Sequence, residues 1–386
     1  MLADIFCRVV DNYGDIGVCW RLARRLAQGR GWRVRLWVDA LPAFAAIAPE
    51  VDPSQARQQV QGIELIRWRD PLPELAPGQV AIEAFACDPP ADYVARMAGQ
   101  GTVWINLEYL SAEDWVEHCH ALPSPQAGGQ RKFFFFPGFT PATGGLLREP
   151  GLIAQRDAWQ ADRGQAERLL EQRLGLSDAL LQAWREGARL VTLFCYAHAP
   201  VQGLLRALAR DSRPSVLLVP QGVAPQAEQA LAASHCQTGS MPRLARIPFV
   251  DQPGFDRLLW SADLNLVRGE DSFVRALWAG RPMLWQIYPQ AEQAHQPKLQ
   301  AWLDRYAPPA AVRQAMLAWN RALPEHTGTQ RAQAEAAFEA ALGAALAEPA
   351  WAGWQAAAAQ WTRQAARRKD LADALADFCE NRAQTG

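Results

Sequence analysis

The chain has 386 residues, of which 49% are hydrophobic and 20% charged, and its formal net charge is -1. This length exceeds one ordinary domain of about 150–200 residues, and the composition is that of a globular protein with a full core. The near-neutral charge disfavours direct nucleic-acid binding. Because the N-terminus lacks a signal-peptide pattern and no apolar run approaches the length of a membrane span, we expect a soluble, cytoplasmic protein without membrane contact.

Short apolar runs alternate with helical stretches in the first half of the chain. A buried strand is predicted at 2–10 and a helix at 15–28, where apolar residues recur close to the helical period. A further helix is predicted near 90–98, and further strands are predicted at 33–39, 62–68, 79–85, 102–110 and 133–139. This alternation favours a parallel sheet with helices on both faces.

The same alternation returns in the second half. Residues 156–185 have helical periodicity, and we interpret Gly187 as the hinge between two domains. Strands then follow at 189–196, 215–220, 243–250, 263–268 and 282–288. After about 292 the chain is helical, and its last helix, near 362–380, places Leu371, Leu375 and Phe378 on one face. The pattern predicts two doubly wound α/β domains in tandem, which glycosyltransferases share with two-domain dehydrogenases and binding proteins.

Cysteines and histidines give no sign of a disulfide framework or a metal site. None of the seven cysteines has CxxC spacing, and Cys7, Cys19 and Cys195 lie in apolar runs, which is typical of buried thiols in a reducing compartment. His118 and His120 form an HxH motif without a further ligand cluster nearby, so we expect no metal there.

Six arginines gather around the first predicted helix and the strand that follows it. They are Arg21, Arg24, Arg25, Arg30, Arg33 and Arg35. The cluster fits a solvated helix face with a strand edge, and it also fits a docking surface for an acidic partner.

The first motif that could carry chemistry is the run from Asp11 to Gly17, DNYGDIG, at the junction of the first strand and the first helix. Sites in open α/β sheets usually lie at such junctions, and Gly14 and Gly17 permit a tight turn that brings backbone close to a ligand. A helix cap formed by Asp15 or Asn12 is the alternative, but capping explains only one of the two carboxylates. The run is not GxGxxG, so a nicotinamide fingerprint is absent.

The second motif is Arg268-Gly269-Glu270-Asp271-Ser272, at a strand-to-helix turn of the second domain. The N-terminus of the helix that follows offers free N–H groups to a phosphate, and Ser272 and Arg268 add a hydroxyl and a positive charge. Glu270 can accept hydrogen bonds from ribose or sugar hydroxyls. The alternative is that Ser272 caps the helix among surface charges.

Aromatic residues follow several predicted strands of the second domain. They are Phe194, Tyr196, Phe249, Phe255 and Tyr288. A nucleotide base is commonly held by stacking on such rings, although each ring alone could also belong to the core. No DxD motif is present, so we expect the helix terminus and Arg268, not a metal ion, to neutralise a leaving diphosphate.

Two segments resemble the elongation factor P arginine rhamnosyltransferases. They are DIFCRVVDNYGDIGVCWRLARRLA at 4–27 and PFVDQPGFDRLLWSADLNLVRGEDSFVRALWAGRPMLWQIYPQ at 248–290. The resemblance implies a GT-B fold, with two Rossmann-like domains facing a central cleft. Residues 1–186 would bind the acceptor and residues 187–361 the nucleotide sugar, with a C-terminal helix at about 362–386 packing back on the first domain.

The same resemblance implies an inverting transfer of rhamnose from dTDP-β-L-rhamnose to one arginine of elongation factor P, which assists polyproline synthesis. Asp15 falls at the position of the catalytic base, Asp11 at its companion carboxylate and Glu270 at an essential glutamate. The positions implied to bind the nucleotide sugar are Tyr13, Gly14, Gly17, Phe194, Tyr196, Phe249, Gln252, Phe255, Arg268, Glu270, Asp271, Ser272 and Tyr288.

The chemistry of these residues suits that reaction independently. An arginine is a poor nucleophile because its pKa exceeds about 12, whereas a carboxylate pair can hold the guanidinium and take a proton from it. Three alternatives stay open: a transferase for a lipid-linked or small-molecule acceptor, a non-catalytic nucleotide-binding partner of a translation factor, and a dehydrogenase, which the missing glycine fingerprint disfavours.

Overall fold

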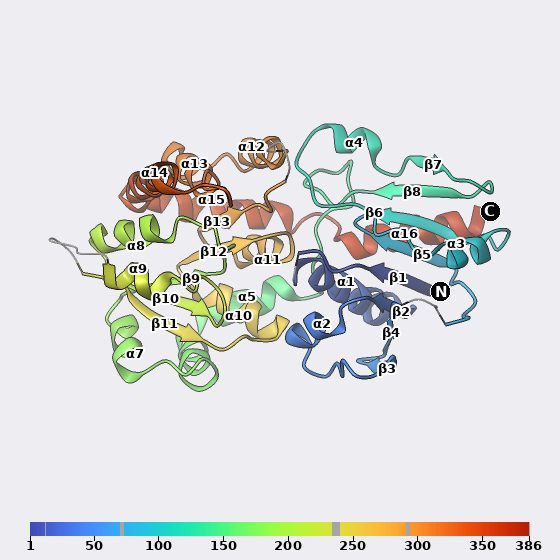
Figure 1. Ribbon diagram of the computed structural model, residues 1–386, viewed down its shortest axis with the longest axis horizontal. Helices are drawn as coiled ribbons and strands as arrows, with labels where there is room; N and C mark the ends of the chain where they lie inside the picture. Colours follow the sequence, from blue (N-terminus) through green and yellow to red (C-terminus); the bar gives the residue numbers. More distant parts are fainter. Residues whose placement is uncertain (12, 70–72, 234–239, 291–293, 386) are drawn as a thin grey trace. The chain divides into compact units, whose positions relative to one another are not determined.

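The computed structural model describes the chain except for residues 12, 70–72, 234–239, 291–293 and 386 (Figure 1). The chain divides into two compact units. The first comprises Met1–Leu152 and Ala365–Gly386, and the second comprises Ile153–Gln364. Each unit is built around its own sheet.

The described part of the first unit contains an eight-stranded sheet in the order β3-β4-β2-β1-β5-β6-β8-β7. The parallel strands are β1 (Leu2–Cys7), β2 (Arg33–Val38), β4 (Ile63–Arg67), β5 (Val80–Ala84), β6 (Val103–Leu107) and β8 (Arg131–Phe135). Two antiparallel edge strands, β3 (Arg57–Val60) and β7 (Pro123–Pro125), are additions that the sequence pattern did not predict, because both are short and largely polar.

Helices cover both faces of this sheet (Figure 1). They are α1 (Gly14–Arg24), which continues as the π-helical turn η1 (Arg25–Gly29), α2 (Leu41–Ile47), α3 (Ala91–Met97), α4 (Trp115–Cys119) and α16 (Leu371–Thr385). Alternate residues of β1 point to opposite faces, as the period of a strand requires. Ile5 and Cys7 join a core with Leu371 and Leu375, whereas Phe6 stacks on Trp37 at 5.3 Å on the α3 side.

The helix that ends the chain is part of the first unit. Leu371, Leu375 and the partly buried Phe378 pack into its core, and Phe378 lies 5.4 Å from Phe133 of β8, ring to ring. The predicted helix at 362–380 is two helices, because α15 (Ala350–Ala365) ends at the boundary between the two units and α16 begins only at Leu371.

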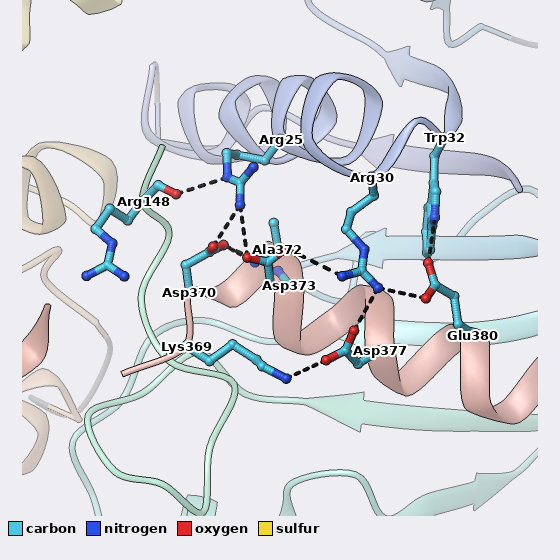
Figure 2. A network of polar contacts seen from close by, with 10 residues as sticks. All are labelled: Arg25, Arg30, Trp32, Arg148, Lys369, Asp370, Ala372, Asp373, Asp377 and Glu380. Atoms are coloured by element: carbon cyan, nitrogen blue, oxygen red, sulfur yellow. Dashed lines mark hydrogen bonds and ion pairs between the residues drawn. The ribbon is translucent and has the colours of Figure 1, made fainter. Parts of the chain in front are cut away.

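Four of the six arginines form ion pairs within the first unit, which neither sequence-based interpretation predicted, whereas Arg33 is exposed. Arg25 pairs with Asp370 at 2.7 Å, and Arg30 pairs with Asp377 and Glu380 of α16, each at 2.7 Å (Figure 2). Arg21 pairs with Glu149 and Arg35 with Asp4, again within the first unit. These contacts were invisible in the sequence because their partners lie far along the chain.

The described part of the second unit contains a five-stranded parallel sheet in the order β11-β10-β9-β12-β13. Its strands are β9 (Arg189–Leu193), β10 (Ser215–Pro220), β11 (Arg243–Ile247), β12 (Leu264–Arg268) and β13 (Met283–Gln286). The helices before and among them are α5 (Leu152–Ala161), α6 (Arg163–Arg168), η2 (Leu169–Arg173), α7 (Asp178–Arg185), α8 (Val201–Arg210), α9 (Ala227–Ala233), α10 (Gln252–Ser261) and α11 (Asp271–Ala279). The helices that follow are α12 (His295–Tyr306), α13 (Ala310–Trp319), α14 (Gly328–Leu346) and α15.

The division of the chain differs from the expected boundary at 186/187. Residues 153–186 belong to the second unit because η2 and α7 bury Leu170, Leu181 and Trp184 in a core with Leu190 and Val216. Gly187 is therefore not a hinge between the units. It follows α7 inside the second unit with a φ of +103°, and its carbonyl accepts a hydrogen bond from Arg213.

Candidate active site

Asp15 lies in the first turn of α1, directly beyond the carboxyl end of β1. Its side chain is only 3% exposed, and its Oδ2 accepts hydrogen bonds from the backbone N–H groups of Val10 and Asp11 at 2.8 and 2.9 Å. The N-cap of α1 is Tyr13, which makes no side-chain capping bond. Asp15 therefore binds the turn before the helix and does not cap it. Asn12, the other capping candidate, lies outside the described residues.

The turn that leads into α1 holds Asp11, Gly14 and Gly17 of the first motif together with Asp15. The amide of Gly14 donates to the carbonyl of Asp11 at 2.7 Å, and the amide of Gly17 donates to the carbonyl of Tyr13 at 2.9 Å. A Cβ at Gly14 would lie 3.0 Å from Oδ2 of Asp11. Gly14 thus leaves room for the Asp11 carboxylate, which lies in the same turn as Asp15.

The environment of Asp15 changes its proton affinity. Burial is the largest influence and raises the pKa of Asp15, and the negative charge of Asp11 acts in the same direction. The amide hydrogen bonds from Asp11 and Val10, and a hydrogen bond with the Tyr109 side chain, lower the pKa of Asp15, but the net change is upward. A buried carboxylate with a raised pKa is a better proton acceptor, as a general base requires.

The second motif lies between β12 and α11 in the second unit. Gly269 adopts a φ of +60°, which favours glycine, and the helix begins at Asp271 with Glu270 as its N-cap and no side-chain capping bond. Ser272 is 6% exposed, and its hydroxyl accepts a hydrogen bond from the Arg268 amide at 3.1 Å and donates one to the Arg268 carbonyl. Ser272 therefore closes the turn, and the capping alternative for this residue is wrong.

Arg268 lies against the aromatic side chains that follow β9. Its guanidinium is 4.6 Å from the ring centre of Phe194 and 4.8 Å from that of Tyr196, and it donates to the Cys195 carbonyl at 3.2 Å. Phe255 lies 5.8 Å from Phe194, and Tyr288 lies 5.7 Å from Tyr196. These five predicted residues form one cluster of a cation and four rings at the carboxyl ends of β9, β12 and β13.

Gln252 and Phe249 come from the segment after β11. Gln252 is the first residue of α10 and is 5% exposed, whereas Phe249 is 36% exposed. The side chain of Asp251 caps α10 by accepting from the Gly254 amide at 2.9 Å. A buried pair between Arg275 and Asp256, with bonds of 2.8 and 2.7 Å, joins α10 to α11 and so holds this segment beside the second motif.

Two residues of these sites were not singled out from the sequence. Tyr109, whose side chain hydrogen-bonds to Asp15, stands at the end of a predicted strand, where an aromatic residue carries no special signal. Gln286 is 1% exposed, and its Oε1 accepts from the Tyr196 amide at 2.8 Å. Several predicted strands extend beyond the carboxyl ends of the observed strands, because apolar and aromatic residues continue into the loops that carry the sites.

Neither a metal cluster nor a membrane helix is found among the described residues. No group of three or more histidine, cysteine, aspartate or glutamate side chains in that part of the chain is arranged so that it could hold a metal ion. In the HxH motif, Nδ1 of His120 accepts a hydrogen bond from the Phe136 amide at 3.0 Å, and burial lowers the pKa of His120. No helix in the described ranges combines the length and the apolarity needed to cross a membrane.

Two tandem Rossmann-like units, each with polar residues at the carboxyl ends of its strands, have the architecture of the GT-B fold. The crystal structure of TcCGT1 in complex with UDP has this fold and superposes with a TM-score of 0.55 and 11% identity, covering 100% of this chain and 99% of that one. At such identity the likeness concerns the fold alone.

The family is shown by closer relatives. The model of the family described as Elongation-Factor P (EF-P) rhamnosyltransferase EarP matches residues 3–380. A protein-arginine rhamnosyltransferase of Pseudomonas putida is 45% identical over 392 residues, covering 98% of each chain. A structure solved to explain EarP-mediated arginine glycosylation of translation elongation factor EF-P superposes with a TM-score of 0.61 and 33% identity, covering 98% of this chain and 99% of that one. The chain belongs to the EF-P rhamnosyltransferase family.

Proposed function

We propose that the protein transfers L-rhamnose from dTDP-β-L-rhamnose to an arginine side chain of elongation factor P, with inversion at the anomeric carbon. Family membership supports the rhamnosyl group and the arginine, and the family description and the related structure name EF-P. The dTDP donor rests on the sequence resemblance and on the chemistry of the second motif.

The observation that carries the proposal is the buried carboxylate of Asp15 beside Asp11. A protonated guanidinium does not attack an electrophile, because its nitrogen lone pairs are engaged in the charged, delocalised system. Asp15, whose pKa burial raises, accepts a proton from the guanidinium, and Asp11 supplies a second carboxylate to orient it. The nitrogen then forms a bond to the anomeric carbon, and the bond from that carbon to the diphosphate oxygen breaks.

The second unit supplies groups suited to the donor. The N-terminus of α11 and the guanidinium of Arg268 offer positive charge to the diphosphate that leaves with the bonding electrons. In this scheme the helix N-terminus and Arg268 neutralise the leaving diphosphate, for which other transferases use a metal ion. The rings around Arg268 suit a nucleotide base, and Glu270 suits sugar hydroxyls. Buried free thiols such as Cys7 and Cys195 fit a reducing compartment such as the cytoplasm.

Intact-mass measurement tests this proposal. The purified protein is incubated with dTDP-β-L-rhamnose and unmodified elongation factor P, and the factor is expected to gain one deoxyhexose on one arginine. Asp15→Asn should abolish the gain while dTDP binding persists. Asp92→Asn, the same change at an exposed position of α3, should behave as wild type. Donor binding without any gain would direct the search to a lipid-linked or small-molecule acceptor, and absence of both would refute the donor.

A further inference from the structure

Tyr109 connects the exposed surface of the first unit to the buried Asp15. It follows β6 by two residues, its side chain is 36% exposed, and it hydrogen-bonds to the carboxylate of Asp15, which is 3% exposed. The Tyr109 phenol is therefore a partly exposed neighbour of a buried carboxylate.

The backbone just before this phenol is held by hydrogen bonds. The Glu108 amide donates to the Phe135 carbonyl at 3.0 Å, and the Phe85 amide donates to the Leu107 carbonyl at 2.7 Å. Asn106 is 2% exposed and joins the two loops. Its Oδ1 accepts from the Ala86 amide at 3.2 Å, and its Nδ2 donates to Oε1 of Glu108 at 2.6 Å. The segments after β5 and β6 thus form one fixed structure.

Phe85 supports the Tyr109 ring from within that structure. The two rings stack with centres 4.4 Å apart and an angle of 18° between their planes. Phe85 and Ala86 have φ values of +59° and +51°, in the left-handed region that residues with a side chain rarely adopt. Such strain persists where the surroundings enforce it, and it concentrates at functional sites. Here it places the Phe85 ring against the phenol.

We propose that Tyr109, supported by Phe85, is a positioning residue with two functions: its hydroxyl orients Asp15, and its ring is the platform on which the acceptor guanidinium lies. This inference rests on the proposed arginine acceptor. The hydroxyl adds a side-chain donor to the two backbone amides that bind Asp15, so the carboxylate is fixed before the acceptor arrives.

The ring function follows from the shape of the acceptor. A guanidinium is planar and delocalised and stacks on aromatic rings, whereas an ammonium group is compact and strongly hydrated. The chain itself contains several such contacts: for example, Arg268 lies 4.6 Å from the Phe194 ring centre, and Arg8 lies 5.1 Å from that of Trp68. A platform at Tyr109 would therefore favour arginine over lysine as the group presented to Asp15.

Two substitutions separate the functions. Tyr109→Phe retains the ring and removes the hydroxyl, so acceptor KM should stay within about 2-fold of wild type, whereas kcat should fall several-fold. Because the hydroxyl lowers the pKa of Asp15, the acid limb of the kcat/KM profile should move to higher pH. Tyr109→Leu removes the ring as well and should additionally raise acceptor KM about 2- to 30-fold, the range of a cation–π contact. Phe85→Leu should raise acceptor KM with a smaller change in the pH profile.

The dTDP affinity of each variant is measured alongside and should equal that of wild type. The inference is overturned if Tyr109→Phe leaves kcat and the pH profile unchanged, or if Tyr109→Leu leaves acceptor KM unchanged. Should the leucine variant fail to fold, the phenylalanine variant alone decides the hydroxyl function, and Phe85→Leu decides the platform. An inactive wild type in the same assay would instead refute the proposed function, so the two failures are distinguishable.

Discussion

Arg25 and Asp370 lie 345 residues apart in the sequence, yet their side chains form an ion pair of 2.7 Å inside the first unit (Figure 2). Both are almost fully buried, with 6% and 7% of their side chains exposed. Arg25 also donates from Nε to the Arg148 carbonyl at 3.0 Å. The pair joins the helical segment that begins beside Asp15 to the helix that closes the chain, so the stability of the first unit should depend on it.

Arg25→Met should destabilise the first unit by about 3–5 kcal/mol, because it leaves the Asp370 carboxylate buried without its cation. Denaturant unfolding measures the loss, and hydrogen exchange should show faster exchange in α16. Arg30→Met is the matched control. Arg30 is 25% exposed and its partners are more exposed still, so removing these pairs should cost only about 0–1 kcal/mol each. Equal losses in the two variants would contradict this account.

The charge of Asp370 can be tested in the Arg25→Met background. Adding Asp370→Asn should recover part of the lost stability, because asparagine carries no charge. Its side-chain oxygen can still accept the hydrogen bond that the Ala372 amide donates to Oδ1 of Asp370 at 2.8 Å. The comparison of the four proteins forms a double-mutant cycle. If the effects of Arg25→Met and Asp370→Asn on the free energy of unfolding were simply additive, loss of the ion pair would not explain the destabilisation by Arg25→Met.

Gly145→Ala should also loosen the docking of α16. Gly145 has a φ of +78°, and a Cβ there would lie 2.5 Å from the Lys369 carbonyl, which immediately precedes Asp370. Gly99 has a φ of +74° with no atom within 4 Å of such a Cβ, so Gly99→Ala isolates the backbone strain, about 1–2 kcal/mol. The Gly145 variant should have the lower unfolding midpoint. Equal midpoints would mean that the carbonyl moves aside without cost.

Arg268→Ala should weaken dTDP binding by about 10- to 100-fold, because a hydrogen bond to a charged group is worth about 1.5–3 kcal/mol. Arg268→Lys retains a charge but loses the planar group that lies against Phe194 and Tyr196, so an intermediate loss is expected. Calorimetric titration measures both. Arg257→Ala, on α10, where Arg257 packs against Trp159, should bind dTDP as wild type does. An unchanged affinity in Arg268→Ala would remove this residue from the donor site.

The activity should fall on the acid side as pH drops through the pKa of Asp15. Burial raises that pKa above the ordinary range of an aspartate, so the loss should begin at a higher pH than an exposed carboxylate would give. The pH dependence of kcat/KM measures this limb. Asp92→Asn should leave the limb in place, whereas a limb at the ordinary aspartate value would argue against Asp15 as the base.

The same carboxylate should make the folded protein less stable at neutral pH. The folded-state pKa of Asp15 is above the unfolded value, so the folded state binds this proton more tightly, and the contribution of Asp15 to stability falls as pH rises through that window. Asp15→Asn should therefore raise the thermal midpoint at pH 7 while abolishing transfer. The difference in midpoint between this variant and wild type should shrink below the unfolded-state pKa of Asp15. A lowered midpoint at pH 7 would show that the hydrogen bonds to the carboxylate outweigh its burial.

The local sequence pattern was sufficient to predict the parallel strands of both sheets and the positions of both motifs in the fold. Apolar runs of β1 and β12 followed by glycine and charged residues specify a strand, a turn and a helix within a few residues, so Asp15 and Arg268 could be placed from the sequence. The aromatic residues Phe194 and Tyr196 could be grouped for the same reason, since the carboxyl ends of parallel strands share one edge.

The sequence by itself determined two tandem α/β units, the family and the chemical character of the two motifs. Only the tertiary structure decided which unit takes residues 153–186, that Arg25 pairs with Asp370, and that Tyr109 reaches Asp15. Periodicity reports which face of an element is buried, but it does not identify the partner. Partners are selected by packing and charge compensation between segments far apart in the chain, because a buried charge or apolar face is stable only when the whole fold supplies its counterpart.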